Sequence, residues 1–114
     1  MPTKTAVRGK APPVVTKDEL LERLAAGEAL QVLNVLDPSR HSLGLIRGSL
    51  AIPYAELPRR WSELDKSREV VTYCSDPASD RARMAAEWLG KRGFRASRYD
   101  GGIREWAAAG LPLE

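Results

Sequence analysis

The feature that most restricts the fold of this chain is a repeated alternation of strand-like and helix-like segments. Short apolar runs bounded by glycine, proline or aspartate predict buried strands at 29–36, 49–53, 69–74 and 94–99. Helical patterns separate or follow them at 16–27, 54–64, 79–92 and 103–110. Strands that alternate with helices form a parallel sheet covered on both faces. We therefore expect an α/β domain with three layers and a mostly parallel central sheet.

The first 13 residues differ in composition from the rest of the chain. They carry several cations and a Pro-Pro pair but almost no large apolar side chain. We therefore expect a flexible N-terminal arm over residues 1–13 and a single domain over residues 14–114. The domain is predicted to open with a helix, because Thr16 and Glu19 match a capping box.

Charge and cysteine content restrict the partners of the chain. Its net charge is only +3, and its 18 Lys and Arg residues are interleaved with 15 Asp and Glu residues, so we expect no nucleic-acid binding and consider a small anionic substrate compatible. Apolar runs are too short for a membrane span or a secretory leader, so no membrane association is expected. The single cysteine cannot form an internal disulfide, which fits a reducing compartment and predicts a cytoplasmic protein.

The only thiol, Cys74, stands where a predicted strand gives way to a predicted helix. In parallel sheets, ligands bind where loops leave the carboxyl ends of the strands. The next residues are small or turn-forming, so their amides and the following helix start are expected to converge on the sulfur and favour a thiolate. The alternative is that Cys74 is simply a small buried hydrophobic residue, as most free cysteines are.

Three segments, VVTYC, MAAEWLGKRGF and YDGGIREWAAAGLPLE, follow one another in residues 69–114. Their order resembles the single-domain rhodanese family of sulfurtransferases, and the Gly-Gly-Ile, Trp106 and AAGLP elements are especially specific. A fainter similarity, carried by LNVLDP and GLIRGSLAIP, extends back to Thr16. The resemblance implies a rhodanese-like fold and a sulfurtransferase or sulfur carrier.

In that family the cysteine takes a sulfane sulfur from a small anionic donor, which is thiosulfate, a persulfide or a polysulfide. The resemblance implies that Cys74 holds this sulfur as a persulfide and passes it to cyanide or to a thiol acceptor, including a thiol of another protein. It implies no metal and no organic cofactor.

The resemblance also places the substrate-binding loop directly after the cysteine, in an extended, proline-containing form. The loop residues are Ser75, Asp76, Pro77, Ala78, Ser79, Asp80 and Arg81. Asn34 is expected to support this loop, because it stands where the family has an aspartate at a strand end. The turn at Gly101 and Gly102 should lie on the same rim of the sheet as Cys74.

The charges of this loop depart from the family pattern. The family has an arginine five residues after the cysteine, but this chain has Ser79 there, so Arg81 is the better candidate for the pocket. Asp76 and Asp80 add carboxylates that repel anionic donors, unless Asp80 or Ser79 caps the following helix. The only histidine, His41, is displaced from the family position and is expected on the surface.

Two other functions remain open beside sulfur transfer. One is a catalytically weak rhodanese-like module that keeps the fold and binds or regulates a partner. The other is a cysteine-dependent phosphatase or arsenate reductase on the same fold. That chemistry needs an arginine six residues after the cysteine to clamp the oxyanion, and this chain has Asp80 there, so it is the least favoured.

Overall fold

A computed structural model describes residues 11–114, without the side chains of residues 40–42. Five strands form one sheet in the order β1-β5-β4-β2-β3, and every neighbouring pair is parallel. The strands are β1 Val14–Val15, β2 Gln31–Asn34, β3 Leu50–Ala51, β4 Val70–Tyr73 and β5 Ala96–Tyr99. The prediction of a largely parallel sheet is confirmed.

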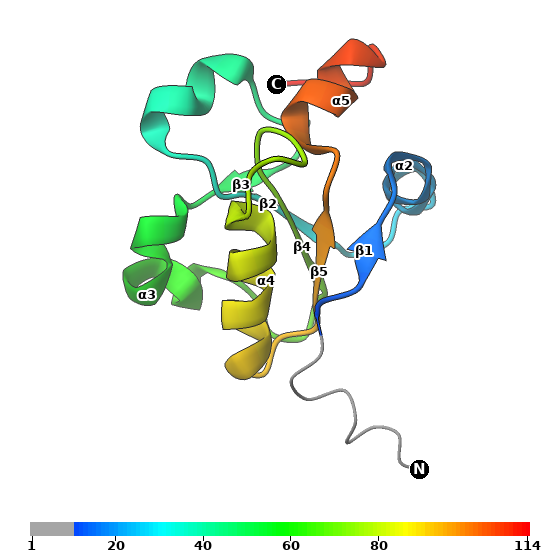
Figure 1. Cartoon of the computed structure of the whole chain (residues 1–114). Helices are drawn as coiled ribbons and strands as arrows, with labels where there is room; N and C mark the ends of the chain where they lie inside the picture. Colours follow the sequence, from blue (N-terminus) through cyan, green and yellow to red (C-terminus); the bar gives the residue numbers. More distant parts are fainter. Residues whose placement is uncertain (1–10) are drawn as a thin grey trace.

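Helices cover both faces of this sheet (Figure 1). They are α2 Lys17–Ala25, α3 Leu57–Arg60, α4 Arg81–Lys91 and α5 Gly102–Ala108, with 3₁₀ turns η1 Pro38–Leu43, η2 Tyr54–Glu56 and η3 Trp61–Glu63. The hydroxyl of Thr72 in β4 donates to the carbonyl of Ala82 in α4, at 2.7 Å. Tyr99 in β5 faces the other way and packs edge-on against Trp106 in α5, with ring centroids 6.0 Å apart. The expected three-layer α/β architecture is confirmed.

The two central strands lie wholly inside the core. Every residue of β2 and β4 is buried, because helices cover both of their faces and strands flank both of their edges. The sheet edges are more open, with Val14 of β1 49% exposed and Leu50 of β3 43% exposed. The most enclosed part of the sheet is therefore β4, the strand that leads to Cys74.

Two elements differ from the sequence-based expectation. The single helix expected over 54–64 is broken into η2, α3 and η3, with Pro58 in the first turn of α3, where its missing amide is tolerated. The short strand β1 was not expected, and it continues a contact in which the amide of Arg98 donates to the carbonyl of Pro13 at 2.9 Å. The expectations for residues 1–10 and for the side chain of His41 lie outside the described part of the chain.

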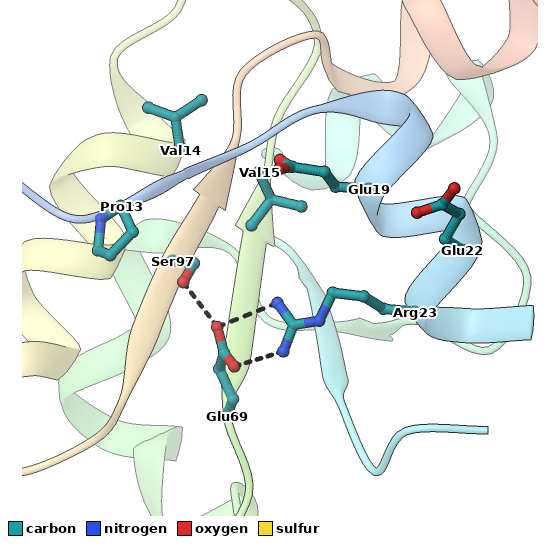
Figure 2. A pocket seen from close by; sticks show the side chains of 8 residues that line it. All are labelled: Pro13, Val14, Val15, Glu19, Glu22, Arg23, Glu69 and Ser97. Atoms are coloured by element: carbon teal, nitrogen blue, oxygen red, sulfur yellow. Dashed lines mark hydrogen bonds and ion pairs between the residues drawn. The ribbon is translucent and has the colours of Figure 1, made fainter. Parts of the chain in front are cut away.

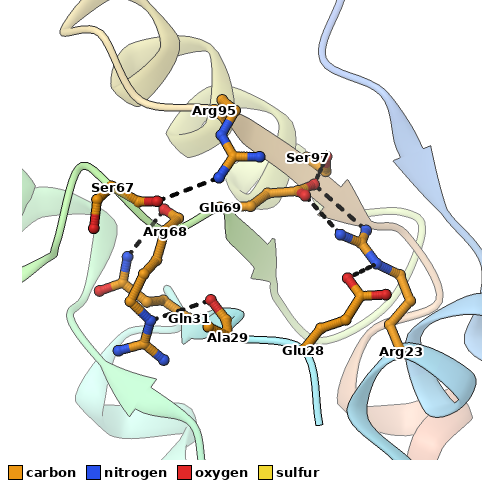
Figure 3. A network of polar contacts seen from close by, with 9 residues as sticks. All are labelled: Arg23, Glu28, Ala29, Gln31, Ser67, Arg68, Glu69, Arg95 and Ser97. Atoms are coloured by element: carbon orange, nitrogen blue, oxygen red, sulfur yellow. Dashed lines mark hydrogen bonds and ion pairs between the residues drawn. The ribbon is translucent and has the colours of Figure 1, made fainter. Parts of the chain in front are cut away.

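A partly buried ion pair ties α2 to the amino end of β4. Arg23 contacts Glu69 at 2.6 Å, and the Ser97 hydroxyl donates to the same carboxylate at 2.7 Å (Figure 2). Burial opposes ionisation of Glu69, but the hydrogen bonds from Arg23 and Ser97 outweigh it and hold the pKa of this carboxyl below its ordinary value. Figure 3 shows how Glu28 supports Arg23 from the other side.

A hollow of about 340 Å³ lies beside this ion pair and is lined by α2, β1 and β5 (Figure 2). Glu69 directly precedes β4, whereas Cys74 directly follows it. The hollow and the ion pair therefore belong to the end of the strand remote from the cysteine. Their contacts hold helix and sheet together and bring no group to the thiol.

Candidate functional site

Cys74 lies at the carboxyl end of β4, between β2 and β5 on either side. Only 1% of its surface is exposed. Its Sγ lies 3.8 Å from the carbonyl oxygen of Asp76 and 3.7 Å from that of Ser79. The loop after the cysteine thus folds back over the sulfur, and the thiol donates to main-chain carbonyls.

Three amides of this loop are engaged elsewhere. The amide of Ala78 donates to the Asp76 carboxylate at 3.0 Å, and the amide of Ser79 donates to the Asp76 carbonyl at 3.1 Å. The amide of Arg81 donates to the Ser79 hydroxyl at 3.3 Å. Within residues 11–114 no main-chain amide donates to Sγ, so the expected ring of amides around the sulfur is wrong for this arrangement.

The two loop carboxylates both have arginine partners. The carboxylate of Asp76 lies 3.2 Å from Nε of Arg104 in α5. The carboxylate of Asp80 lies 3.1 Å from Arg83 in α4. Their repulsion of an anionic donor is therefore weaker than the charge count of the loop indicates.

The start of α4 is capped through the serine. Asp80 occupies the N-cap position but makes no side-chain hydrogen bond to the helix, whereas the Ser79 hydroxyl accepts from the amide of Arg81. The side chain of Arg81 extends to Asp37, just after β2, at 3.0 Å. Arg81 thus links the loop to the neighbouring strand end, and its guanidinium is already paired.

The turn before α5 anchors the same loop. Gly102 has a φ of +73°, and a Cβ atom there would lie 2.6 Å from the carbonyl oxygen of Cys74. The amides of Ile103 and Arg104 donate to the carbonyls of Cys74 and Ser75, at 2.9 and 3.0 Å. Only glycine permits both this backbone conformation and this close approach.

The other glycine of the turn, Gly101, has a different environment. A Cβ atom there would overlap the carboxylate of Glu105, which accepts a hydrogen bond from the hydroxyl of Tyr99 at 2.7 Å. Of the remaining loop residues, Pro77 and Ala78 are exposed on the outer side, whereas Ser75 is buried.

A buried polar network joins the carboxyl ends of β2 and β4 to the segment 46–49. Asn34 is fully buried; its carbonyl accepts from the amide of Leu36 at 2.8 Å, and its amide donates to the hydroxyl of Tyr73 at 3.3 Å. That hydroxyl also accepts from the amide of Ile46 at 3.0 Å and lies 2.8 Å from the hydroxyl of Ser49. Burial raises the pKa of Tyr73, so its hydroxyl stays protonated and joins these hydrogen bonds as a neutral group. The support of the cysteine loop by Asn34 stays a prediction, and the role of Tyr73 in this network was not expected from the sequence.

The comparisons with known proteins fit this architecture. The chain matches the family model described as rhodanese-like domain over residues 16–109. The chain belongs to the rhodanese-like domain family. It is similar to a sulfurtransferase of Allochromatium vinosum, at 34% identity over 100 residues that cover 87% of this chain and 92% of that protein. The family and this relative support sulfur transfer as the general chemistry.

Two further similarities extend the comparison. A rhodanese-related protein from Thermoplasma volcanium superimposes with a TM-score of 0.78 at 27% identity, covering 90% of this chain and 97% of that one. An HTH-type transcriptional regulator of Mycobacterium tuberculosis is 36% identical over 112 residues, which are 95% of this chain. The rhodanese-like chain spans only 47% of the length of that regulator. Among residues 11–114, no helix has the length and apolarity needed to cross a membrane.

Proposed function

We propose that this rhodanese-like domain is a sulfurtransferase or sulfur carrier in which Cys74 bears the transferred sulfur. The observation that carries the proposal is the position of the thiol, at the carboxyl end of a central strand and under a loop that folds back onto it. A purely structural cysteine has no use for such a loop, whose main chain is held by two amides of α5. The sulfurtransferase relative supports the same chemistry.

The proposed reaction has two displacement steps. The Cys74 thiolate, its proton released to solvent, attacks the outer sulfur of an anionic donor, and the sulfur–sulfur bond of the donor breaks. The bonding pair leaves with sulfite from thiosulfate, or with a thiolate from an organic persulfide. Cys74 then holds a persulfide anion, whose outer sulfur is attacked by an acceptor thiolate or by cyanide, and this attack restores the cysteine thiolate. Each step balances without an added oxidant or reductant.

Intact-mass measurement after incubation with thiosulfate or polysulfide tests the proposal. We expect the wild-type chain to gain the mass of one sulfur and to lose it on treatment with cyanide. The Cys74→Ser variant is the control, because the chain has no second thiol. An adduct that persists in this variant would show that Cys74 is not the carrier, and a folded wild-type protein that gains no sulfur from any donor would refute sulfur transfer.

The second candidate is a rhodanese-like module that binds or regulates a partner. Two observations favour it: the sulfur is 1% exposed, and a similar segment occurs in a protein named as a transcriptional regulator. This reading is the one that a folded but unreactive Cys74 would support. Oxyanion chemistry gains no support, because Asp80, which stands where an arginine would be needed, is paired with Arg83.

A further inference from the structure

A second hollow adjoins the loop of the cysteine. It has a volume of about 240 Å³ and lies between η1 and α5, lined by Leu43, Ile103, Arg104 and Ala107. Two of these lining residues donate their amides to the carbonyls of Cys74 and Ser75. One wall of the hollow is therefore continuous with the backbone that holds the sulfur. Since a water molecule takes about 30 Å³ of liquid volume, the hollow has room for a ligand larger than thiosulfate.

The lining combines three apolar side chains with one cation. The side chain of Arg104 is 55% exposed, and its ionic partner within residues 11–114 is Asp76, which it approaches through Nε at 3.2 Å. The contact that defines this ion pair involves Nε, and the two terminal nitrogens of the guanidinium make no hydrogen bond with a residue in 11–114. Two parallel N–H groups of this kind bind a carboxylate well. The hollow thus presents an apolar wall and a carboxylate-binding group next to the backbone that holds Cys74 and Ser75.

We infer that Arg104 determines donor specificity by binding the carboxylate of a small organic persulfide whose hydrocarbon part occupies the hollow beside Leu43. This inference rests on the proposed function, and it names the class of sulfur donor. The Cys74 thiolate attacks the outer sulfur of the donor, the donor's sulfur–sulfur bond breaks, and the electron pair leaves on the carboxylate-bearing thiolate. The cysteine retains the sulfur as a persulfide, so the step needs no other reactant.

The ion pair between Arg104 and Asp76 gives the donor a way to reach a covered sulfur. Asp76 is the loop residue whose carbonyl accepts from the thiol and whose carboxylate reaches α5. The pair is partly exposed to solvent, so replacing one carboxylate by another costs little. When the donor carboxylate takes the place of Asp76 on the guanidinium, the loop loses its side-chain link to α5. Donor binding and uncovering of the sulfur are thereby coupled through one arginine.

Two donors that differ in one charged group test this inference. The persulfide of 3-mercaptopropionate carries a carboxylate, and that of 2-mercaptoethanol carries a hydroxyl in its place. We expect wild-type Cys74 to be loaded by the carboxylate donor about tenfold more efficiently, the factor that corresponds to one charged hydrogen-bonded contact. The Arg104→Gln variant should lose this preference, because its loading by the carboxylate donor no longer exceeds its loading by the neutral donor. Arg59→Gln is the matched control, because Arg59 is 72% exposed on α3, outside the site.

A binding measurement separates this inference from the proposed function. We expect the Cys74→Ser variant, which cannot react, to bind the thiol 3-mercaptopropionate more tightly than 2-mercaptoethanol, and an added Arg104→Gln change to abolish the difference. Loading by both donors without preference would overturn the role of Arg104 and leave sulfur transfer standing. Equal slowing of both donors in Arg104→Gln would also overturn it, in favour of a structural role. Arginine-dependent binding without any loading of the wild type would instead overturn sulfur transfer.

Discussion

Replacing Gly102 with alanine tests how firmly α5 holds the reactive loop. A Cβ atom at this position would lie 2.6 Å from the carbonyl oxygens of both Cys74 and Ser75. The backbone of Gly102, with a φ of +73°, also disfavours any side chain. The chain supplies a matched control in Gly110, which has a φ of +72° and no atom within 4 Å of the equivalent Cβ position. The two substitutions share the backbone strain and differ in the overlap.

The expected losses follow from these two contributions. A left-handed backbone costs a non-glycine residue about 1–2 kcal/mol, and the reduced freedom of the unfolded chain offsets about 0.4–1 kcal/mol of that cost. Gly110→Ala should therefore lower the free energy of unfolding by about 1 kcal/mol. Gly102→Ala should lower the free energy of unfolding by about 2–4 kcal/mol more than Gly110→Ala does. Relieving the overlap displaces the loop and weakens two main-chain hydrogen bonds.

Urea denaturation followed by tryptophan fluorescence measures both losses. Alkylation of the single thiol under native conditions supplies a second readout, and we expect the rate to rise in Gly102→Ala and to stay near the wild-type rate in Gly110→Ala. Equal losses of stability in the two variants, with unchanged alkylation, would refute the close packing of the Gly102 turn on the loop.

Two further predictions concern the interior. Asn34→Leu should lower the free energy of unfolding by about 1–3 kcal/mol in urea denaturation, because the Asn34 side chain makes two hydrogen bonds in a buried site, one with the Leu36 amide and one with the Tyr73 hydroxyl. An unchanged midpoint would contradict this account. Burial opposes ionisation of Glu69, but Arg23 keeps the pKa of this carboxyl in the folded state below the ordinary 4.5. The ionised carboxylate therefore stabilises the fold fully above pH 4.5. This contribution is lost as the pH falls through the lowered pKa of the folded state. Denaturation midpoints should thus fall less steeply below pH 4.5 in Glu69→Gln than in the wild type, and parallel curves would rule the contribution out.

The order of strands and helices was predictable because burial selects residue types locally. Strand β4 is covered on both faces, and its run of β-branched and aromatic residues reflects that. Strand β1 was missed, since Val14 and Val15 become a strand only by pairing with a distant segment, at Arg98 and Tyr99. Short strands of this kind carry no periodic signal of their own.

The position of the cysteine was also predictable, but the direction of the loop groups was not. The site follows from the end of a strand, which the sequence marks clearly. The loop amides do not reach the sulfur because Asp76 binds two of them: its carbonyl accepts a hydrogen bond from Ser79, and its carboxylate accepts one from Ala78. Arg104 was overlooked because one arginine in a short helix resembles any solvated residue, and only its contact with Asp76 reveals its place beside the loop.

The anchoring of the loop by α5 also affects the order in which the protein can mature. A ribosome delivers β4 and Cys74 before Ile103 and Arg104, whose amides hold the carbonyls of Cys74 and Ser75. While α5 is still inside the exit tunnel, the newly made thiol lacks this restraint and is open to oxidants and to exchange with other disulfides. Docking of α5 then covers the backbone around the sulfur, so the thiol gains this protection only after α5 has been made and has docked.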